Sequence, residues 1–241
     1  MEEGQICGDR IVITGDDVNH IKNVLRMKIG EEIAVSNGVD GKEYRCEIAQ
    51  FETDEVICKL RFIKEDGVEL PARVYLFQGL PKADKMELII QKAVELGVYS
   101  VIPVATKRSI VKLDDKKATA KQNRWQSIAE AAAKQSKRKI IPEIGKVVSF
   151  REALDIAEEL DVKLIPYELA QDMRHTKDII EGIQEGQGVA IFIGPEGGFD
   201  DTEIELASEF GVEPITLGKR ILRTETAGMT VLAWLMYHLE R

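Results

Sequence analysis

The sequence predicts an α/β protein in which a small antiparallel β-barrel is followed by a larger domain built on a mostly parallel sheet. Up to about residue 63, short segments of alternating polarity are separated by turn signals, which is typical of antiparallel strands. After residue 71, apolar runs alternate with helical segments, which is typical of a parallel sheet flanked by helices. With 241 residues, 44% of them apolar, the chain can form both cores.

The N-terminal domain is expected over residues 1–70. Its strands are predicted in EIAVS, YRCEI and VICKLRF, with turns at NGVDG and ETDE. One helix is predicted from about Asp17 to Met27, with one apolar face and with Gly30 beyond its end. The members of that face are Val18, Ile21, Val24 and Leu25. The charged, proline-ended stretch KEDGVELP, residues 64–71, is the predicted boundary.

The second domain is expected over residues 71–241. Its strands are predicted in RVYLFQGL, YSVIPVA, VKLIPY, GVAIFIG and EPITLG. Three helix starts match the capping-box spacing: Asp84 with Glu87, Ser149 with Glu152, and Asp200 with Glu203. Gly97 and Gly211 are the matching helix stops.

The charge distribution is uneven. The net charge of −9 opposes a polyanionic partner, yet residues 106–140 carry a net +8, so the rest of the chain sums to −17. Residues 19–30 form a second basic segment without acids, which includes His20, Lys22 and Arg26. Two segments could therefore contact phosphates. The alternative is that both are solvated helix faces.

Several classes of protein are disfavoured. No run of about 18 uncharged apolar residues and no secretion signal occurs, so we expect a cytoplasmic protein without a membrane span. Cys7, Cys46 and Cys58 have no CxxC spacing, and His175 and His238 have no partners at ligand spacing. We expect no metal site, and we expect the cysteines to act as small strand-borne hydrophobes.

Two glycine-containing loops follow predicted strands in the last third of the chain. Strand 189–193 leads into GPEGGF, residues 194–199, and the next strand ends at Gly218 before KRILRTETAG. Glycines let a ligand approach the backbone, and neighbouring strand ends can share one crevice. The alternative is a tight structural connection. Neither GxGxxG nor GK[ST] occurs after RVYLFQGL, the first predicted strand of the second domain, which disfavours dinucleotide-binding and P-loop enzymes.

The final segment, TVLAWLMYHLE, predicts a helix that is hydrophobic nearly all round and must therefore be buried. Because the chain already has material for a core, we expect burial partly against a second subunit, and hence a homodimer. Packing within its own subunit is the alternative.

IGPEGGF and LGKRILRTETA closely resemble the cofactor-binding signature of the RsmE family of knotted SPOUT methyltransferases. HIKNVLRM, at residues 20–27, resembles that family's RNA-binding motif, and three further blocks extend the likeness over nearly the whole chain. These blocks are KMELIIQKAVELGV, RSIVK and RWQSIAEAAAKQSKR. The resemblance implies a PUA-like barrel, a trefoil-knotted α/β domain, S-adenosylmethionine as cofactor, and methylation of N3 of one uridine in 16S ribosomal RNA, either free or in the assembled small subunit.

The resemblance also implies site residues. Those expected to bind the cofactor are Ile193, Gly194, Pro195, Glu196, Gly197, Gly198, Leu217, Gly218, Ile221, Leu222, Arg223 and Thr224. Those expected to bind RNA are His20, Lys22, Arg26, Lys107, Arg108 and Arg124. Two positions depart from the usual pattern: Lys107 stands where an acid is common, and Lys137 stands where glycine is common.

Methyl transfer to uracil N3 requires loss of the N3 proton, so a cation should face the resulting anion. Arg223 is the first candidate, and Arg138, contributed by the partner subunit, is the second. Both could instead form salt bridges. Glu196 and Glu225 could accept the proton, but structural roles are favoured for both. The competing functions are a non-catalytic ribosomal-RNA-binding module and a small nucleotide-handling enzyme.

Overall fold

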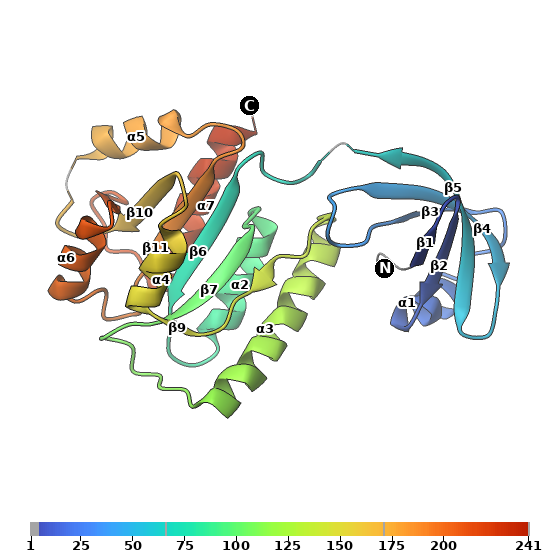
Figure 1. Ribbon diagram of the computed structural model, residues 1–241, viewed down its shortest axis with the longest axis horizontal. Coiled ribbons are helices and arrows are strands. Elements are labelled where there is room, and N and C mark those ends of the chain that lie inside the picture. The colour runs from blue at the N-terminus through green and yellow to red at the C-terminus, as the bar shows by residue number, and fades with distance from the viewer. Residues whose placement is uncertain (1–4, 66, 171, 241) are drawn as a thin grey trace. The chain divides into compact units, whose positions relative to one another are not determined.

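The computed structural model describes residues 5–65, 67–170 and 172–240. The chain divides into two compact units (Figure 1). The N-terminal unit comprises residues 1–69 and 137–141, and the C-terminal unit comprises residues 70–136 and 142–241. The domain boundary predicted between residues 70 and 71 stays a prediction. The sequence did not indicate that residues 137–141 group with the N-terminal unit.

The N-terminal unit contains a five-stranded antiparallel sheet in the order β1-β2-β5-β4-β3. Its strands are β1 (Ile6–Cys7), β2 (Arg10–Thr14), β3 (Glu32–Val35), β4 (Glu43–Phe51) and β5 (Glu55–Lys64). Alternate residues of β4, namely Tyr44, Cys46 and Ile48, are buried in the core of this unit, because successive side chains of a strand point to opposite faces. The predicted antiparallel architecture is confirmed.

The predicted helix over residues 17–27 is only partly correct. The structure has α1 (Asp16–Asn19) and then a π-helical turn, η2 (His20–Val24). Val18 and Ile21 are buried as expected, but Val24 and Leu25 are 62% and 54% exposed. In η2 the N–H of Leu25 donates to the carbonyl of His20 at 2.8 Å, and this wider turn changes the helical register of the residues after it.

The cysteines are described in part. Cys46 and Cys58 are free thiols in the core of the N-terminal sheet, as expected for small hydrophobes. Burial raises the pKa of each thiol to about 11, so both stay protonated at neutral pH. The side chain of Cys7 lies outside the described part of the chain.

The C-terminal unit contains a seven-stranded sheet in the order β12-β10-β11-β6-β7-β8, with β9 also paired to β7, and every pair is parallel. Its strands are β6 (Arg73–Gly79), β7 (Ser100–Ala105), β8 (Glu143–Ile144), β9 (Val148–Ser149), β10 (Val162–Pro166), β11 (Gly188–Ile193) and β12 (Glu213–Ile215). The central strands are buried on both faces, which explains their unbroken apolar runs. The predicted parallel sheet is confirmed.

Six helices of the C-terminal unit connect or cover these strands in the described residues. They are α2 (Lys85–Glu95), α3 (Asp115–Gln135), α4 (Phe150–Ala157), α5 (Met173–Gly182), α6 (Asp201–Glu209) and α7 (Thr224–Leu239). The capping boxes predicted at Ser149 and Asp200 are confirmed by reciprocal hydrogen bonds. The one predicted at Asp84 is wrong: Asp84 makes no side-chain cap bond, and Glu87 pairs with Arg124 instead.

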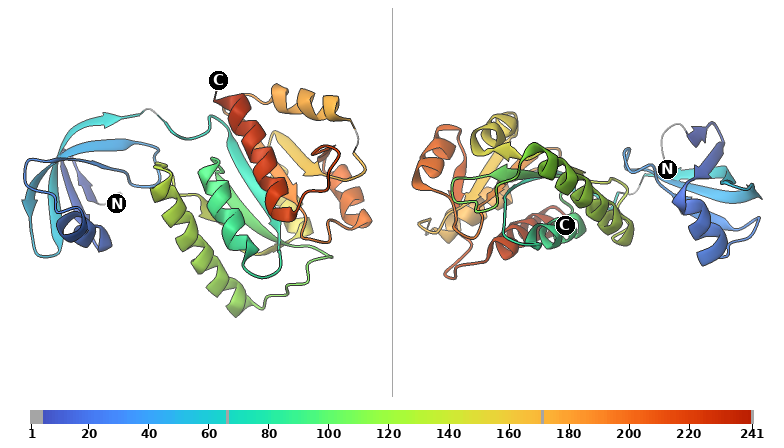
Figure 2. Two further views of the ribbon diagram at one scale, coloured as in Figure 1. Left: turned by 180° about the vertical axis from the view of Figure 1, so that it is seen from behind. Right: turned by 90° about the horizontal axis from the view of Figure 1, so that it is seen from below.

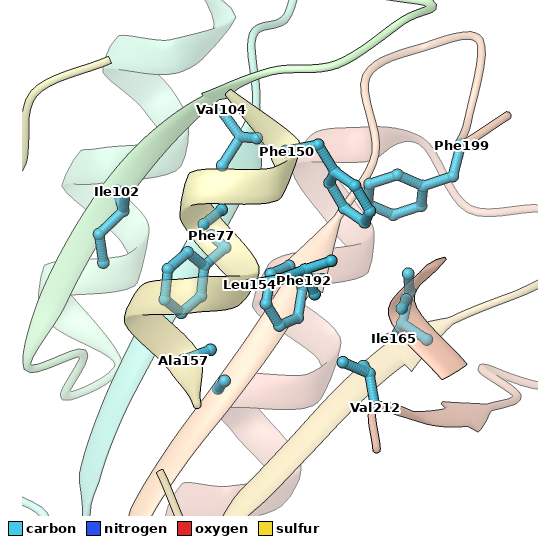
Figure 3. Close-up of a cluster of buried hydrophobic side chains, with 13 residues drawn as sticks. Phe77, Ile102, Val104, Phe150, Leu154, Ala157, Ile165, Phe192, Phe199 and Val212 are labelled. Carbon is cyan, nitrogen blue, oxygen red and sulfur yellow. The ribbon is translucent and has the colours of Figure 1, made fainter. Parts of the chain in front are cut away.

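The helices cover both faces of the sheet. Helices α2 and α7 lie side by side on one face (Figure 2, left), and α4 lies on the other (Figure 1). Under α4 the core is aromatic: Phe77 of β6 and Phe192 of β11 stack with ring centroids 4.6 Å apart, and Phe150 of α4 lies against Phe192 (Figure 3). Phe199 joins this cluster, 5.4 Å from Phe150, and so anchors the end of the loop that follows β11.

Helix α7 packs against α2, α5 and β11. One side of it is buried, through residues such as Val231, Leu232 and Leu235. Met229, Ala233 and Met236 are only partly buried within the single chain. The C-terminal unit therefore buries one side of α7, and the rest of the apolar surface predicted for this helix stays partly exposed in the single chain.

Lys137, where the family commonly has glycine, has φ +60°, a left-handed conformation that side chains rarely adopt. We therefore expect Lys137→Gly to raise the free energy of unfolding by about 0.5–1 kcal/mol. Lys134→Gly, in the last turn of α3, is the matched control and should lower it by about 1 kcal/mol. Urea denaturation measures both, and a destabilised Lys137→Gly variant would contradict the explanation.

Among the described residues, no helix is long and apolar enough to cross a membrane.

Candidate cofactor-binding site

The loops that follow β10, β11 and β12 meet in one cavity of about 530 Å³ in the C-terminal unit. All twelve residues that the sequence proposed for the cofactor line it. Strands β11 and β12 are not neighbours as expected, because β10 lies between them. The end of β10 therefore contributes Pro166, Tyr167 and Glu168, which the sequence did not indicate. The cofactor role of the lining residues stays a prediction.

Thr224, at the start of α7, holds two sides of the cavity together. Its buried hydroxyl donates to the carbonyl of Gly194 at 2.6 Å and accepts a hydrogen bond from Nε2 of Gln78 at 2.9 Å. Gln78 is fully buried at the end of β6. The side chain of Thr224 thus joins the first turn of α7 to the loop after β11 and to the end of β6, which are distant from one another in the sequence.

Glycines make the turn after β11 tight. A Cβ on Gly194 would lie 3.0 Å from the carbonyl carbon of Gly198, and a Cβ on Gly79 would lie 2.7 Å from Cδ of Pro195. The contact at Gly79 is closer than side chains allow, so this position needs glycine, and the contact at Gly194 is tighter than most side chains show, so a larger residue there would push the turn apart.

Glu196 acts as a structural carboxylate, the role that was favoured for it. It accepts a hydrogen bond from the backbone N–H of Lys82 at 3.1 Å and pairs with the ammonium of Lys85 at 2.9 Å. Burial alone would raise its pKa, but these hydrogen bonds outweigh burial and hold the pKa of Glu196 below its ordinary value. Glu196 is therefore ionised at neutral pH and is unsuited to hold a proton there.

Arg108 and Lys107 border the same loop. Arg108 lines the cavity, donates to the carbonyl of Gly197 at 3.2 Å, and lies 3.5 Å from a carboxylate oxygen of Asp200. Lys107 contacts Thr202 through its ammonium and donates its backbone N–H to buried Glu203 at 2.8 Å. Arg108 thus braces the loop after β11, and Lys107 braces the start of α6.

The two candidate arginines have different surroundings. Arg223 is exposed, directly precedes α7 and lines the cavity. Arg138 belongs to the N-terminal unit, where its buried guanidinium pairs with Glu69, with Nε 2.9 Å from the carboxylate. The cavity is lined by residues of the C-terminal unit, and the catalytic role of Arg138 stays a prediction.

The remaining residues predicted to bind RNA lie on both units. His20 and Arg26 are exposed in the N-terminal unit. The ammonium of Lys22 donates to the carbonyl of Thr53 at 3.0 Å. Arg124, on α3, pairs with Glu87 at 2.7 Å. Trp125 beside it is buried, so its indole ring packs in the core.

No group of three or more His, Cys, Asp or Glu residues within the described ranges is arranged to hold a metal ion.

Comparison with known protein families matches both units. The family described as RNA methyltransferase domain matches residues 68–236, and the family described as RNA methyltransferase PUA domain matches residues 13–61. The predicted fold class, with a PUA-like N-terminal domain, is confirmed.

Curated relatives span nearly the whole chain. A protein of Bacillus subtilis named ribosomal RNA small subunit methyltransferase E is 40% identical, covering 95% of this chain and 90% of the relative. A protein of Aquifex aeolicus with the same name is 30% identical, covering 95% of each chain.

Solved structures agree. A Legionella pneumophila methyltransferase in complex with S-adenosylmethionine is 35% identical, with a TM-score of 0.79, covering 95% of this chain and 92% of that one. A Neisseria gonorrhoeae ribosomal RNA small subunit methyltransferase E bound to S-adenosylmethionine is 30% identical, with a TM-score of 0.80, covering 97% and 93%.

Proposed function

Because the chain belongs to the RNA methyltransferase family that includes the ribosomal RNA small subunit methyltransferase E proteins, we propose that it methylates N3 of one uridine in small-subunit (16S) ribosomal RNA. It is an S-adenosylmethionine-dependent methyltransferase. The observation that carries the proposal is the joining of three strand-end loops into one cavity beside an exposed arginine.

The cavity suits S-adenosylmethionine in size and in chemistry. Its volume of about 530 Å³ falls within the usual range for small-molecule sites. The glycine-containing loop segments 194–198 and 216–224 bring backbone to the wall of the cavity, where a nucleoside can approach main-chain groups, and Ile193 and Leu217 offer apolar surface. Strand ends of an open parallel sheet are the usual place for such a ligand.

When bound, S-adenosylmethionine supplies an activated methyl group, so the protein's task is to orient the base and to stabilise charge. Loss of the N3 proton spreads negative charge over the uracil carbonyl oxygens. Arg223 would face that charge at the rim of the cavity, where its guanidinium would stabilise it. Glu196, paired with Lys85, would keep the loop after β11 in place.

Ribosomal RNA is the expected partner, through the exposed residues of the N-terminal unit together with Lys107, Arg108 and Arg124. A homodimer would cover the partly buried side of α7, and a second subunit could supply Arg138. A cytoplasmic location follows from this substrate.

The proposed function is tested by incubating the protein with labelled S-adenosylmethionine and small ribosomal subunits from a strain that lacks this gene. Mass spectrometry should map the label to N3 of one uridine. Label on a ribose or on a protein would overturn the substrate. RNA binding without any cofactor binding would identify a non-catalytic RNA-binding module instead.

The contribution of the N-terminal basic segment is tested by Arg26→Gln. Because each phosphate contact adds a roughly independent electrostatic contribution, we expect about a fivefold weaker affinity for ribosomal RNA and a smaller salt dependence. Affinity for S-adenosylmethionine should not change. Arg10→Gln, on β2 of the same unit, is the control for a general loss of positive charge. Equal losses for both variants in filter-binding assays would contradict a specific contact.

A further inference from the structure

Lys85 is the first residue of α2 and lines the cofactor cavity. A cation is disfavoured at the start of a helix, because the unpaired N–H groups there carry partial positive charge. No side-chain cap at Asp84 offsets this. No individual role was predicted for Lys85 from the sequence, and a cation at this position goes against the usual helix preferences.

The ammonium of Lys85 lies between two carboxylates from different parts of the fold. It is 2.9 Å from Glu196, in the loop after β11, and 3.5 Å from Glu225, in the first turn of α7. The buried Oε2 of Glu225 has no hydrogen-bond partner, so this ion pair compensates its charge. The hydrogen bond that the ammonium of Lys85 donates to Glu196 is the main cause that raises the pKa of Lys85 above its ordinary value.

The turn that precedes α2 is shaped around the same carboxylate. Ala83 has φ +54°, a left-handed conformation that costs free energy for a residue with a side chain. One residue before it, the N–H of Lys82 donates to Glu196 at 3.1 Å. Residues 82–85 therefore direct the N–H of Lys82 and the ammonium of Lys85 to Glu196. They do so despite two unfavourable local features, namely the left-handed backbone of Ala83 and the cation at the start of α2.

We infer that Lys85 is a positioning residue: by joining Glu196 to Glu225, it fixes the loop after β11 against the start of α7 and holds the cofactor cavity open before the ligand enters. This inference rests on the proposed function, because it concerns the same cavity. Without Lys85, two carboxylates would face each other, and the loop would have to be ordered at the moment of binding, which lowers affinity.

The test compares Lys85→Met with Lys85→Arg by calorimetry. We expect Lys85→Met to weaken S-adenosylmethionine binding about tenfold and to raise KM with little change in kcat, and Lys85→Arg to restore most of the affinity. Lys92→Met is the matched control: Lys92 lies on the same helix, pairs with Glu95 at 2.8 Å, and does not line the cavity. It should bind as the wild type does.

A second ligand separates positioning from direct contact. 5′-Methylthioadenosine has the adenosine part but lacks the amino-acid carboxylate that a lysine could bind. If Lys85 acts through the loop, Lys85→Met should weaken both ligands by the same factor. If only S-adenosylmethionine binding weakens, Lys85 contacts the ligand itself and the inference is wrong.

Glu196→Gln breaks the same linkage from its other end, and by itself it should weaken S-adenosylmethionine binding about as much as Lys85→Met does, so it tests the inference even if Lys85→Met folds poorly. It removes the charge but keeps an oxygen for the N–H of Lys82. We expect the double variant to bind no more weakly than Lys85→Met alone, because both changes break one linkage. Additive losses would contradict the inference. Absence of S-adenosylmethionine binding by the wild type would instead refute the proposed function.

Discussion

Gly79→Ala is expected to weaken S-adenosylmethionine binding at least about a hundredfold and to lower the free energy of unfolding by about 2 kcal/mol, the range typical of overpacking. Gly79 ends β6, and its added Cβ would lie 2.7 Å from Cδ and 2.8 Å from N of Pro195. These atoms belong to a ring and to the backbone, so they cannot rotate away. The loop after β11 must shift instead, and the cavity shifts with it.

Gly182→Ala is the matched control for this substitution. Gly182 ends α5, and an added Cβ would meet no atom within 4 Å. We expect unchanged cofactor affinity and a slight gain in stability from better helix propensity. Calorimetry and urea denaturation on both variants measure the effects. Wild-type affinity in Gly79→Ala would show that the position of Pro195 does not control the cavity.

Arg223→Gln is expected to lower the single-turnover rate of methyl transfer about 10²- to 10³-fold, the usual effect of removing one group that stabilises a developing anion. Binding of S-adenosylmethionine should weaken only slightly, because the guanidinium is exposed at the rim of the cavity and opposes charge on the base rather than on the cofactor. Arg223→Lys should retain part of the rate, since it keeps the charge but loses the planar fork.

Arg151→Gln is the control for this arginine. Arg151 lies on α4 and pairs with Asp155 on the same exposed helix face. Its loss should leave the rate unchanged. If Arg223→Gln transferred methyl groups at the wild-type rate, Arg223 would not be the stabilising cation, and Arg138 would become the leading candidate.

Local signals in the sequence predicted most of the fold. The alternation along β4, the apolar runs of β6, β7 and β11, and the capping boxes at Ser149 and Asp200 all depend on contacts within a few residues or within one element. Gly97 and Gly211 were identified as helix stops for the same reason, and both have a positive φ, of 89° and 68°. Such features are readable because sequence spacing sets them directly.

Features that depend on distant contacts could not be predicted in this way. The insertion of β10 between β11 and β12 is a matter of strand order, which local patterning does not specify. Gln78 and Lys85 acquire their roles only through Thr224 and Glu196, more than a hundred residues away. The pairing of Arg138 with Glu69, across 69 residues, is of the same kind.

The sequence indicated two loops that line the cavity, but it did not indicate the residues that support them. Glycine-rich segments are recognisable because glycine has few other reasons to cluster at strand ends. A buried glutamine or a lysine at a helix start has no such signature. The one available signal was the disfavoured cation at the first position of α2, which only becomes informative once the helix start is known.

The most direct test of the central claim is a crystal structure of the protein soaked with S-adenosylhomocysteine, the product form of the cofactor. We expect density for its adenosine between residues 193–198 and 216–224, with the sulfur directed towards Arg223. Density at any other place, or loops 194–198 and 216–223 filled by their own side chains with no ligand between them, would contradict the account.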